Sequence, residues 1–225
     1  MKKTFYCEWA YVLGLLFLVI ATALTKRADL GLSMVVAPAY ILHLLLSPTF
    51  EFVTFGTATY IFQGILLVAM CIAIGRFRIS YLFSFVTAVI YGYLLDAAVF
   101  FVNFIPADNL IVRIVLFVAG IVICSLGVSM MFHTYIKPEV YELFVKEVSI
   151  RFSFDINRVK TIYDITSCVF ATIVSLVAFG TLYGVGVGTI VCAFVNGLMI
   201  AAFSRFLDKR FDFKPRFSRL QKIMD

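Results

Sequence analysis

The sequence predicts an all-α, polytopic membrane protein whose six transmembrane helices form two inverted repeats of three. The first reason is composition. Of the 225 residues, 63% are hydrophobic and 14% are charged, against about 25% charge in soluble domains, and the mean hydropathy is +1.03. The second reason is a repeated layout, because the second half of the chain follows the order of the first.

Six apolar stretches have the length that a bilayer crossing requires, which is about 20 residues in an α-helix. Little sequence remains outside them, so we expect almost no soluble mass. The stretches cover approximately Trp9–Thr25, Thr57–Gly75, Ser80–Ile105, Leu110–His133, Thr161–Gly180 and Gly186–Phe206.

Three short segments of the first half have counterparts about a hundred residues later, with offsets that drift by a few residues. Each half holds an odd number of spans, so the halves must point in opposite directions across the bilayer, as in many small transporters. We expect a first repeat at residues 1–107, a second at 108–208 and a basic tail at 209–225. The paired segments are Ala37-Pro38-Ala39-Tyr40 with Lys137-Pro138-Glu139-Val140-Tyr141, Thr59-Tyr60-Ile61-Phe62-Gln63 with Thr161-Ile162-Tyr163-Asp164, and Val86-Thr87-Ala88-Val89-Ile90-Tyr91-Gly92 with Val191-Cys192-Ala193-Phe194-Val195-Asn196-Gly197.

The basic residues predict the orientation. With the N-terminus inside, all of the 19 Lys and Arg except Lys26, Arg27 and Arg113 fall on the inner side. This bias follows the positive-inside rule, so both termini are expected in the cytoplasm. The first span could also be read as a signal peptide, with Ala21-Thr22-Ala23 as a cleavage site. Its near-full span length, and the repeat that needs it, favour a retained helix.

The tail carries basic residues with phenylalanines between them, from Arg205 to Lys222. Such a segment suits anionic lipid headgroups, which we expect as its partner in preference to nucleic acid. Its phenylalanines are Phe206, Phe211, Phe213 and Phe217.

Two connectors between spans are unusual. The outer one, 28–56, contains an apolar run too short to span a membrane and too apolar to lie in water, which predicts a re-entrant or interfacial segment. The inner one, from Pro138 to Phe152, predicts an amphipathic helix at the membrane surface. These connectors could be a pair of gates, or surface helices that seal the bundle. The apolar face of the inner helix holds Val140, Leu143, Phe144 and Val148, and Glu139, Glu142 and Lys146 face away.

Polar residues inside spans are candidate site residues, because each needs a partner or water in an apolar environment. Asp96 lies in the outer half of the third span, and Asn196 lies near the middle of the sixth. Tyr91 and Asn196 each precede a glycine and correspond in the repeat, so we expect both to face a common interior with Asp96. The alternative is hydrogen bonding that only holds the helices together.

Gln63 and Asp164 form a second approximately symmetric pair of candidates. Lys160 lies four residues before Asp164, on the same helical face. Their pairing could be plain charge neutralisation at a helix end, or Asp164 could belong to a polar or proton-coupled site.

Catalytic and metal chemistry find little support. The five cysteines have no C-x-x-C spacing and no histidine at ligand spacing, so we expect packing residues rather than disulfides or metal ligands. We find no nucleophile with a plausible base and no paired carboxylates within one span. The sequence therefore predicts neither an enzyme nor a cofactor.

Several motifs resemble the YitT/YczE-like family of bacterial integral membrane proteins, over about Val12 to Asp208. They are Ala28-Asp29-Leu30-Gly31 after the first span, Arg158 with Asp164, and Gly186-Val187-Gly188-Thr189. This sequence departs from the family in having Gln63 where the first half could carry an acid, and only a short tail after Arg205. The resemblance implies a multi-pass protein of the bacterial cytoplasmic (inner) membrane and indicates no substrate.

Two functions are compatible with these features. The first is a small transporter or substrate-binding membrane component, with a solute site between the repeats, in a homodimer that completes the wall around the path. The few acids within the spans suggest a neutral solute. The second is a non-transporting scaffold or regulatory partner that acts through its cytoplasmic loop and basic tail.

Overall fold

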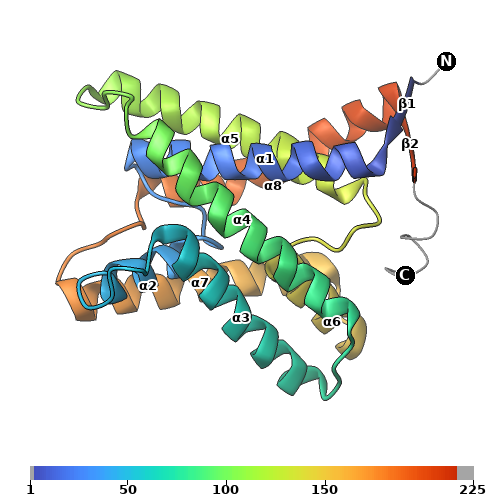
Figure 1. Cartoon of the computed structure of the whole chain (residues 1–225), viewed down its shortest axis with the longest axis horizontal. Helices are drawn as coiled ribbons and strands as arrows, with labels where there is room; N and C mark the ends of the chain where they lie inside the picture. Colours follow the sequence, from blue (N-terminus) through green and yellow to red (C-terminus); the bar gives the residue numbers. More distant parts are fainter. Residues whose placement is uncertain (1–2, 217–225) are drawn as a thin grey trace.

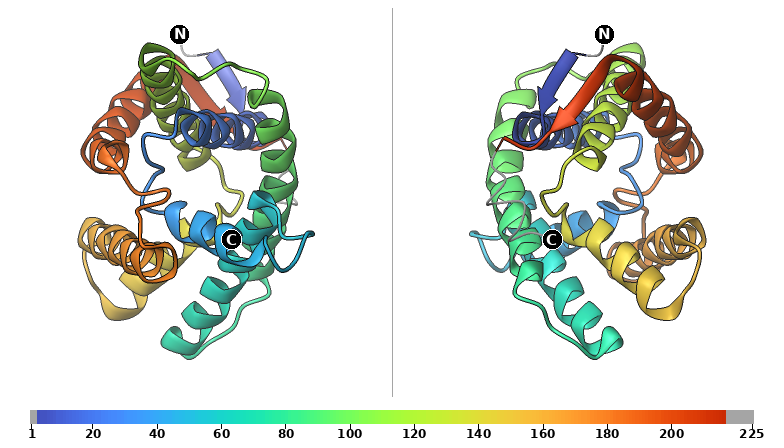
Figure 2. Two further views of the ribbon diagram at one scale, coloured as in Figure 1. Left: turned by 90° about the vertical axis from the view of Figure 1, so that its left-hand side faces the viewer. Right: turned by 90° about the vertical axis from the view of Figure 1, so that its right-hand side faces the viewer.

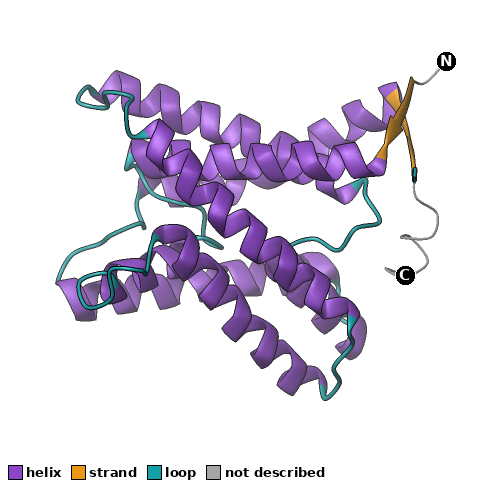
Figure 3. Cartoon of the chain, in the orientation of Figure 1, coloured by secondary structure: helices purple, strands orange, loops and turns teal. Residues whose placement is uncertain are grey.

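The computed structural model describes residues 3–216, apart from the side chain of Asn157. This part of the chain folds into eight helices with one short pair of strands (Figures 1 and 3). The elements are β1 (Lys3–Tyr6), α1 (Cys7–Ala28), α2 (Ala37–Leu46), α3 (Phe55–Ile74), α4 (Ser80–Val102), α5 (Leu110–Phe132), α6 (Val140–Phe152), α7 (Ile156–Phe179), α8 (Val187–Arg210) and β2 (Phe211–Lys214).

Six of these helices are long and apolar enough to cross a membrane, namely α1, α3, α4, α5, α7 and α8. They fall on the six predicted stretches, which confirms the prediction of an all-α, polytopic membrane protein. The two remaining helices, α2 and α6, occupy the two unusual connectors.

The helices pack in a definite order. α1 lies against α5, with α4 on the other flank of α1 and α8 beside α5. α3 packs along α4, and α2 and α6 both contact α3 and α7. Viewed end on in Figure 2, α1, α5 and α8 lie on one side, α2, α3, α6 and α7 on the other, and α4 runs between the two groups. The described part of the chain has no comparable packing between α7 and α8.

Glycines permit the closest approach of α1 and α5. A Cβ added to Gly14 would lie 2.9 Å from the Gly127 carbonyl oxygen, and one added to Gly127 would lie 2.8 Å from the Gly14 oxygen. Small residues allow helix backbones in membranes to meet in this way. The helices α3 and α4 cross similarly, since a Cβ on Gly92 would lie 2.6 Å from the Gly56 oxygen.

The placement of α6 corrects one expectation. The inner connector forms a helix as predicted, but Glu139 does not face water, because it is only 6% exposed. Val140, Tyr141 and Leu143 are buried beside it. The helix is packed against α3, α4 and α7, so residues on both of its sides contact protein. The amphipathic pattern was therefore a poor guide to which face meets solvent.

The two ends of the described chain meet in a parallel sheet, in which Phe5 is opposite Phe213. The Phe5 ring packs edge-on against Phe211 and Phe213, at centroid distances of 5.5 and 5.7 Å. The tail expected from residue 209 thus begins inside α8 and continues as β2. Phe217 and Lys222 lie outside the described residues, and lipid contact by the tail remains a prediction.

Candidate functional site

A buried polar cluster joins α3 to the start of α6. Gln63, which is fully buried, donates from Nε2 to Glu139 Oε2 at 2.8 Å. Its Oε1 accepts from the backbone N–H of Val140 at 3.0 Å. Because the first backbone N–H groups of a helix have no partner within the helix, this bond satisfies one of them. Both ends of the amide are used, so α3 and α6 are held together by a single side chain.

Two further groups extend the cluster toward α7. Glu142 lies one turn beyond Glu139, deep among the helices, yet it is only half-buried. On α7, the Lys160 Nζ lies 3.8 Å from Asp164 Oδ2. The charges of both residues act on Glu142, so the acids of α6 and the ion pair of α7 belong to one electrostatic site.

The carboxyl groups of Glu139 and Glu142 both have raised pKa values. Burial, followed by the nearby charge of Glu142, raises the pKa of Glu139 to about 8, although the hydrogen bond from Gln63 opposes this. Burial also raises the pKa of Glu142, while the Lys160 charge opposes it. A carboxyl group in a low-dielectric environment favours its neutral form. The cluster can therefore hold or release a proton near neutral pH.

Tyrosines surround this pair of acids. The Tyr91 hydroxyl, on α4, forms a 2.7 Å hydrogen bond with Thr22 Oγ1 of α1, and both glutamate charges act on it. Tyr141 is 4% exposed, and its buried hydroxyl has no hydrogen-bond partner in the part of the chain that the structure describes. The site is thus lined by acids, an amide and phenol groups from several helices.

The predicted site residues fall into three groups. Gln63 and Asp164 belong to the cluster and Tyr91 lies beside it, although no contact among the described residues brings all three together. Asn196 lies on α8, and its buried Oδ1 has no partner among the described residues. Asp96 lies elsewhere, on α4, beside the start of α3. A binding role for each of these residues stays a prediction.

Asp96 has a clear structural contact. Its carboxylate accepts a hydrogen bond from Thr54 Oγ1 at 2.5 Å and another from the backbone N–H of Gly56 at 2.8 Å. Thr54 is the N-cap of α3. Negative charge at a helix N-terminus is stabilising, because unpaired N–H groups and the helix dipole are directed at it. This contact accounts for an acid at this position without a ligand.

Sequence reasoning missed Glu139 and Glu142 as site residues. Both were assigned to the solvent face of a surface helix, although Glu139 lay within a segment that already matched the first half of the chain. Glu147 of the same helix falls on its apolar side in the sequence. In the structure its Oε2 accepts a 2.8 Å hydrogen bond from the Tyr81 hydroxyl of α4, so polar side chains of α6 point toward protein.

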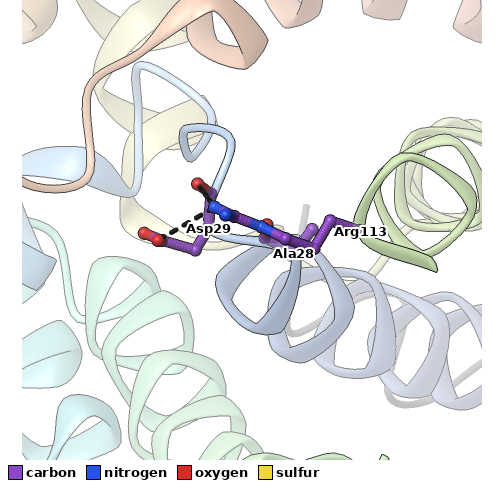
Figure 4. Close-up of polar contacts among 3 residues, drawn as sticks. All are labelled: Ala28, Asp29 and Arg113. Atoms are coloured by element: carbon purple, nitrogen blue, oxygen red, sulfur yellow. Dashed lines mark hydrogen bonds and ion pairs between the residues drawn. The ribbon is translucent and has the colours of Figure 1, made fainter. Parts of the chain in front are cut away.

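A second contact between the halves involves the motif after α1 (Figure 4). Asp29 ends α1 in the left-handed conformation. The Arg113 guanidinium of α5 donates to the Ala28 carbonyl oxygen at 2.7 Å and to the Asp29 carbonyl oxygen, and it pairs with Asp29 Oδ2 at 3.0 Å. One arginine thereby fixes the end of α1 against α5.

The glycine-rich loop before α8 packs directly on this motif. The Gly188 N–H donates to the Leu30 carbonyl oxygen at 2.8 Å, and the Leu32 N–H donates to the Gly184 oxygen at 2.8 Å. Gly31 has φ +121°, and a Cβ there would lie 2.7 Å from Thr189 Oγ1. Glycine is needed where backbones approach so closely. The loop is therefore a packing element.

An open, apolar hollow lies away from the polar cluster. It encloses about 710 Å³ between α3 and α4 and is lined mainly by apolar residues such as Leu67, Ile72 and Phe85. With Arg76 as its only charged lining residue, it offers few groups to orient a polar solute. Within the described residues, no group of three or more His, Cys, Asp or Glu could hold a metal ion.

Comparison with known proteins identifies a family. A family model described as a family of unknown function, DUF6198, matches residues 6–205. No curated protein and no solved structure matches the chain. The match covers all six candidate spans and both α2 and α6, apart from the last residues of α8. This polytopic membrane protein therefore belongs to the DUF6198 family.

Proposed function

We propose that the protein is a small membrane transporter that binds its solute at the cluster formed by Gln63, Glu139, Glu142, Lys160 and Asp164. One observation carries the proposal. Acids and an amide are gathered where α6 contacts α3 and α7, with the half-exposed ammonium group of Lys160 beside them, and polar groups at such a place are costly unless they serve a function. Solute sites of small transporters lie at such junctions between two halves of the chain.

The packing order supports an inverted repeat of two three-span halves. The contact of α1 with α4 has a counterpart in α5 with α8, and that of α2 with α3 in α6 with α7. The contact of α3 with α6 likewise corresponds to that of α7 with α2. A twofold relation through α1 and α5 would produce this pattern. The α3–α4 contact lacks a counterpart between α7 and α8, as expected if one of two alternating states is represented.

We further propose the cellular setting that the sequence predicts. The two strands at the chain ends lie side by side, which supports termini on one side of the membrane, and the basic residues favour the cytoplasmic side. The resemblance of the sequence motifs to the YitT/YczE-like family favours the bacterial inner membrane, and two residues of those motifs, Asp29 and Gly31, lie against Arg113 and Thr189. The exposed faces of α7 and α8 support a homodimer.

The test is a thermal-stability screen of the purified, detergent-solubilised protein against a library of metabolites and ions. A ligand that binds only the folded state raises the melting temperature. We expect such a ligand for the wild type, a smaller shift for Glu139→Gln and Glu142→Gln, and accumulation of the ligand in proteoliposomes. Glu51→Gln, which removes an acid from an exposed loop, is the control and should respond as the wild type does.

Equal shifts in all four proteins would move the site away from the cluster. If no compound shifts the wild type, a scaffold role becomes the better proposal. Deletion of the basic tail should then abolish binding to a partner protein, while Glu139→Gln leaves it unchanged.

A further inference from the structure

The buried cluster has an excess of acid. It contains the carboxyl groups of Glu139, Glu142 and Asp164, and the ammonium group of Lys160 beside them belongs to a side chain that is 47% exposed. That ammonium group pairs with Asp164 at 3.8 Å. Neither Glu139 nor Glu142 forms an ion pair with any residue that the structure describes. The two acids at the start of α6 thus lack an ion-pair partner, and the charge of the half-exposed Lys160 offsets only part of the cost of ionising Glu142.

A buried tyrosine hydroxyl without a hydrogen-bond partner among the described residues indicates that a ligand could bind beside it. The Tyr141 side chain is 4% exposed, and its hydroxyl has no hydrogen-bond partner within residues 3–216. The charges of Glu139 and Glu142 both act on this hydroxyl, so it lies beside the unpaired acids. A buried polar group left unpaired costs about 1–3 kcal/mol. Glu142 is partly exposed, and we expect a molecule bound beside it to contact this hydroxyl as well as the carboxyl groups.

Aromatic rings complete the surroundings. The rings of Phe144 and Tyr163 lie 5.4 Å apart, and those of Phe62 and Tyr141 lie 6.4 Å apart. Aromatic faces attract cations, and they favour weakly hydrated organic ammonium groups in particular. Divalent metal ions instead need many oxygen ligands, and the described residues contain no group of three or more candidate ligands.

We infer that the cluster binds an organic ammonium ion, held by the carboxylates of Glu139 and Glu142 with the ring and hydroxyl of Tyr141 against it. The inference rests on the proposed function and specifies the substrate class of the same site. It replaces the expectation of a neutral solute, which counted only the acids within the spans. The two acids of α6 were not in that count.

Binding of such a cation depends on pH. Because burial raises the pKa of both glutamates, part of the pair is protonated at neutral pH, and only the ionised form attracts a cation. Affinity should therefore increase as pH rises through about 8, the pKa of Glu139. The other titratable groups that face the pair are Tyr11 of α1, Tyr91 of α4, Cys124 of α5, Tyr141 of α6, and Lys160, Tyr163 and Asp164 of α7.

The experiment compares two probes of the same shape. Choline carries a quaternary ammonium group, and 3,3-dimethyl-1-butanol is its uncharged isostere; methylammonium and tetramethylammonium extend the charged series. Dissociation constants are measured by thermal shift at pH 6, 7, 8 and 9 on the wild type, Glu139→Gln, Glu142→Gln and the Glu51→Gln control. Glutamine keeps the size of the side chain and can still accept the hydrogen bond from Gln63, so folding is retained.

We expect an ammonium probe to bind at least tenfold more tightly than the isostere, with affinity that increases between pH 6 and 9. Either cluster variant should weaken binding about tenfold and flatten the pH dependence, while the loop control should not. If an uncharged or anionic compound binds at the cluster and no ammonium probe does, the substrate class is wrong but the transporter proposal stands. If no compound of any charge shifts the melting temperature, both proposals fail together.

Discussion

Gln63 shows how much a single side chain can organise when it is wholly buried. Its amide satisfies the carboxyl group of Glu139 and the N–H of Val140 at once. An apolar residue at position 63 would leave both groups unpaired. A carboxylate there would lie beside the carboxyl group of Glu139 and repel its ionised form. An amide supplies one donor and one acceptor, which is what the start of α6 requires. Gln63 therefore has a structural role as an amide, although the corresponding residue in the second half of the chain, Asp164, is an acid.

The raised pKa of Glu139 makes a prediction about stability. Its value is about 8 in the folded protein and 4.5 without the protein environment. Between these values the folded state binds more protons than the unfolded state, so the free energy of unfolding falls as pH rises. We expect the melting temperature of the wild type to fall from pH 5 to pH 9. Glu139→Gln cannot titrate and should show a shallower fall.

Melting curves of the detergent-solubilised proteins across this pH range provide the measurement. Glu51→Gln, in an exposed loop, should keep the wild-type slope. Identical slopes for Glu139→Gln and the wild type would mean that Glu139 is not buried in solution.

At the scale of elements, the spans could be read from the sequence and the position of α6 could not. Long apolar stretches can be satisfied only as membrane-crossing helices, so the bounds of α1, α3, α4, α5, α7 and α8 follow closely from hydropathy. The short helix α6 is different. Its apolar residues and its charged residues both contact protein. The periodic pattern of one helix cannot predict which other helices pack against its polar face. Glu139 was misplaced for this reason.

The same limit applied to Asp96. Its presence inside a span predicted a functional role, but the partner it has in the structure, the first turn of α3 at Gly56, is distant in sequence. A polar residue in a span indicates that some partner exists. It does not distinguish a helix terminus from a solute.

Two glycines on α4 and α8 test the difference between the halves. Gly92 lies against α3, where a Cβ would be 2.6 Å from the Gly56 oxygen, whereas Gly197 has nothing within 4 Å. Gly92→Ala should destabilise the protein by about 1–3 kcal/mol through overpacking. Gly197→Ala should be neutral or stabilise it by up to about 1 kcal/mol, because alanine favours helices.

Melting temperatures of the two variants in detergent give the comparison, and each serves as the control for the other. If Gly197→Ala is as destabilising as Gly92→Ala, then the exposed face of α8 is covered in the native protein. Either α7 or a second copy of the chain would then pack on it.

At the scale of the whole molecule, the strand pair ties the last residues of the described chain to the first. Truncation after Arg210 removes β2 and with it the ring contacts of Phe5 with Phe211 and Phe213. Aromatic pairs contribute about 0.5–1.5 kcal/mol each beyond their buried area, so we expect a loss of about 2 kcal/mol. Truncation after Arg216 keeps β2 and is the matched control, and its melting temperature should stay close to that of the wild type.

Equal melting temperatures for the two truncated proteins would show that the strand pair contributes nothing to stability. Loss of stability in the shorter protein alone would assign the effect to β2 and not to the charges that follow it.

The strand pair also has a consequence for how the chain is threaded through the bilayer. β1 and β2 can meet only if an even number of crossings separates them. A chain in which one span failed to insert would leave the two strands on opposite faces of a hydrocarbon layer about 30 Å thick. The four-residue strands at the two ends can thus pair only when an even number of spans has been inserted. The N-terminal strand stays without its partner until the last span is in place.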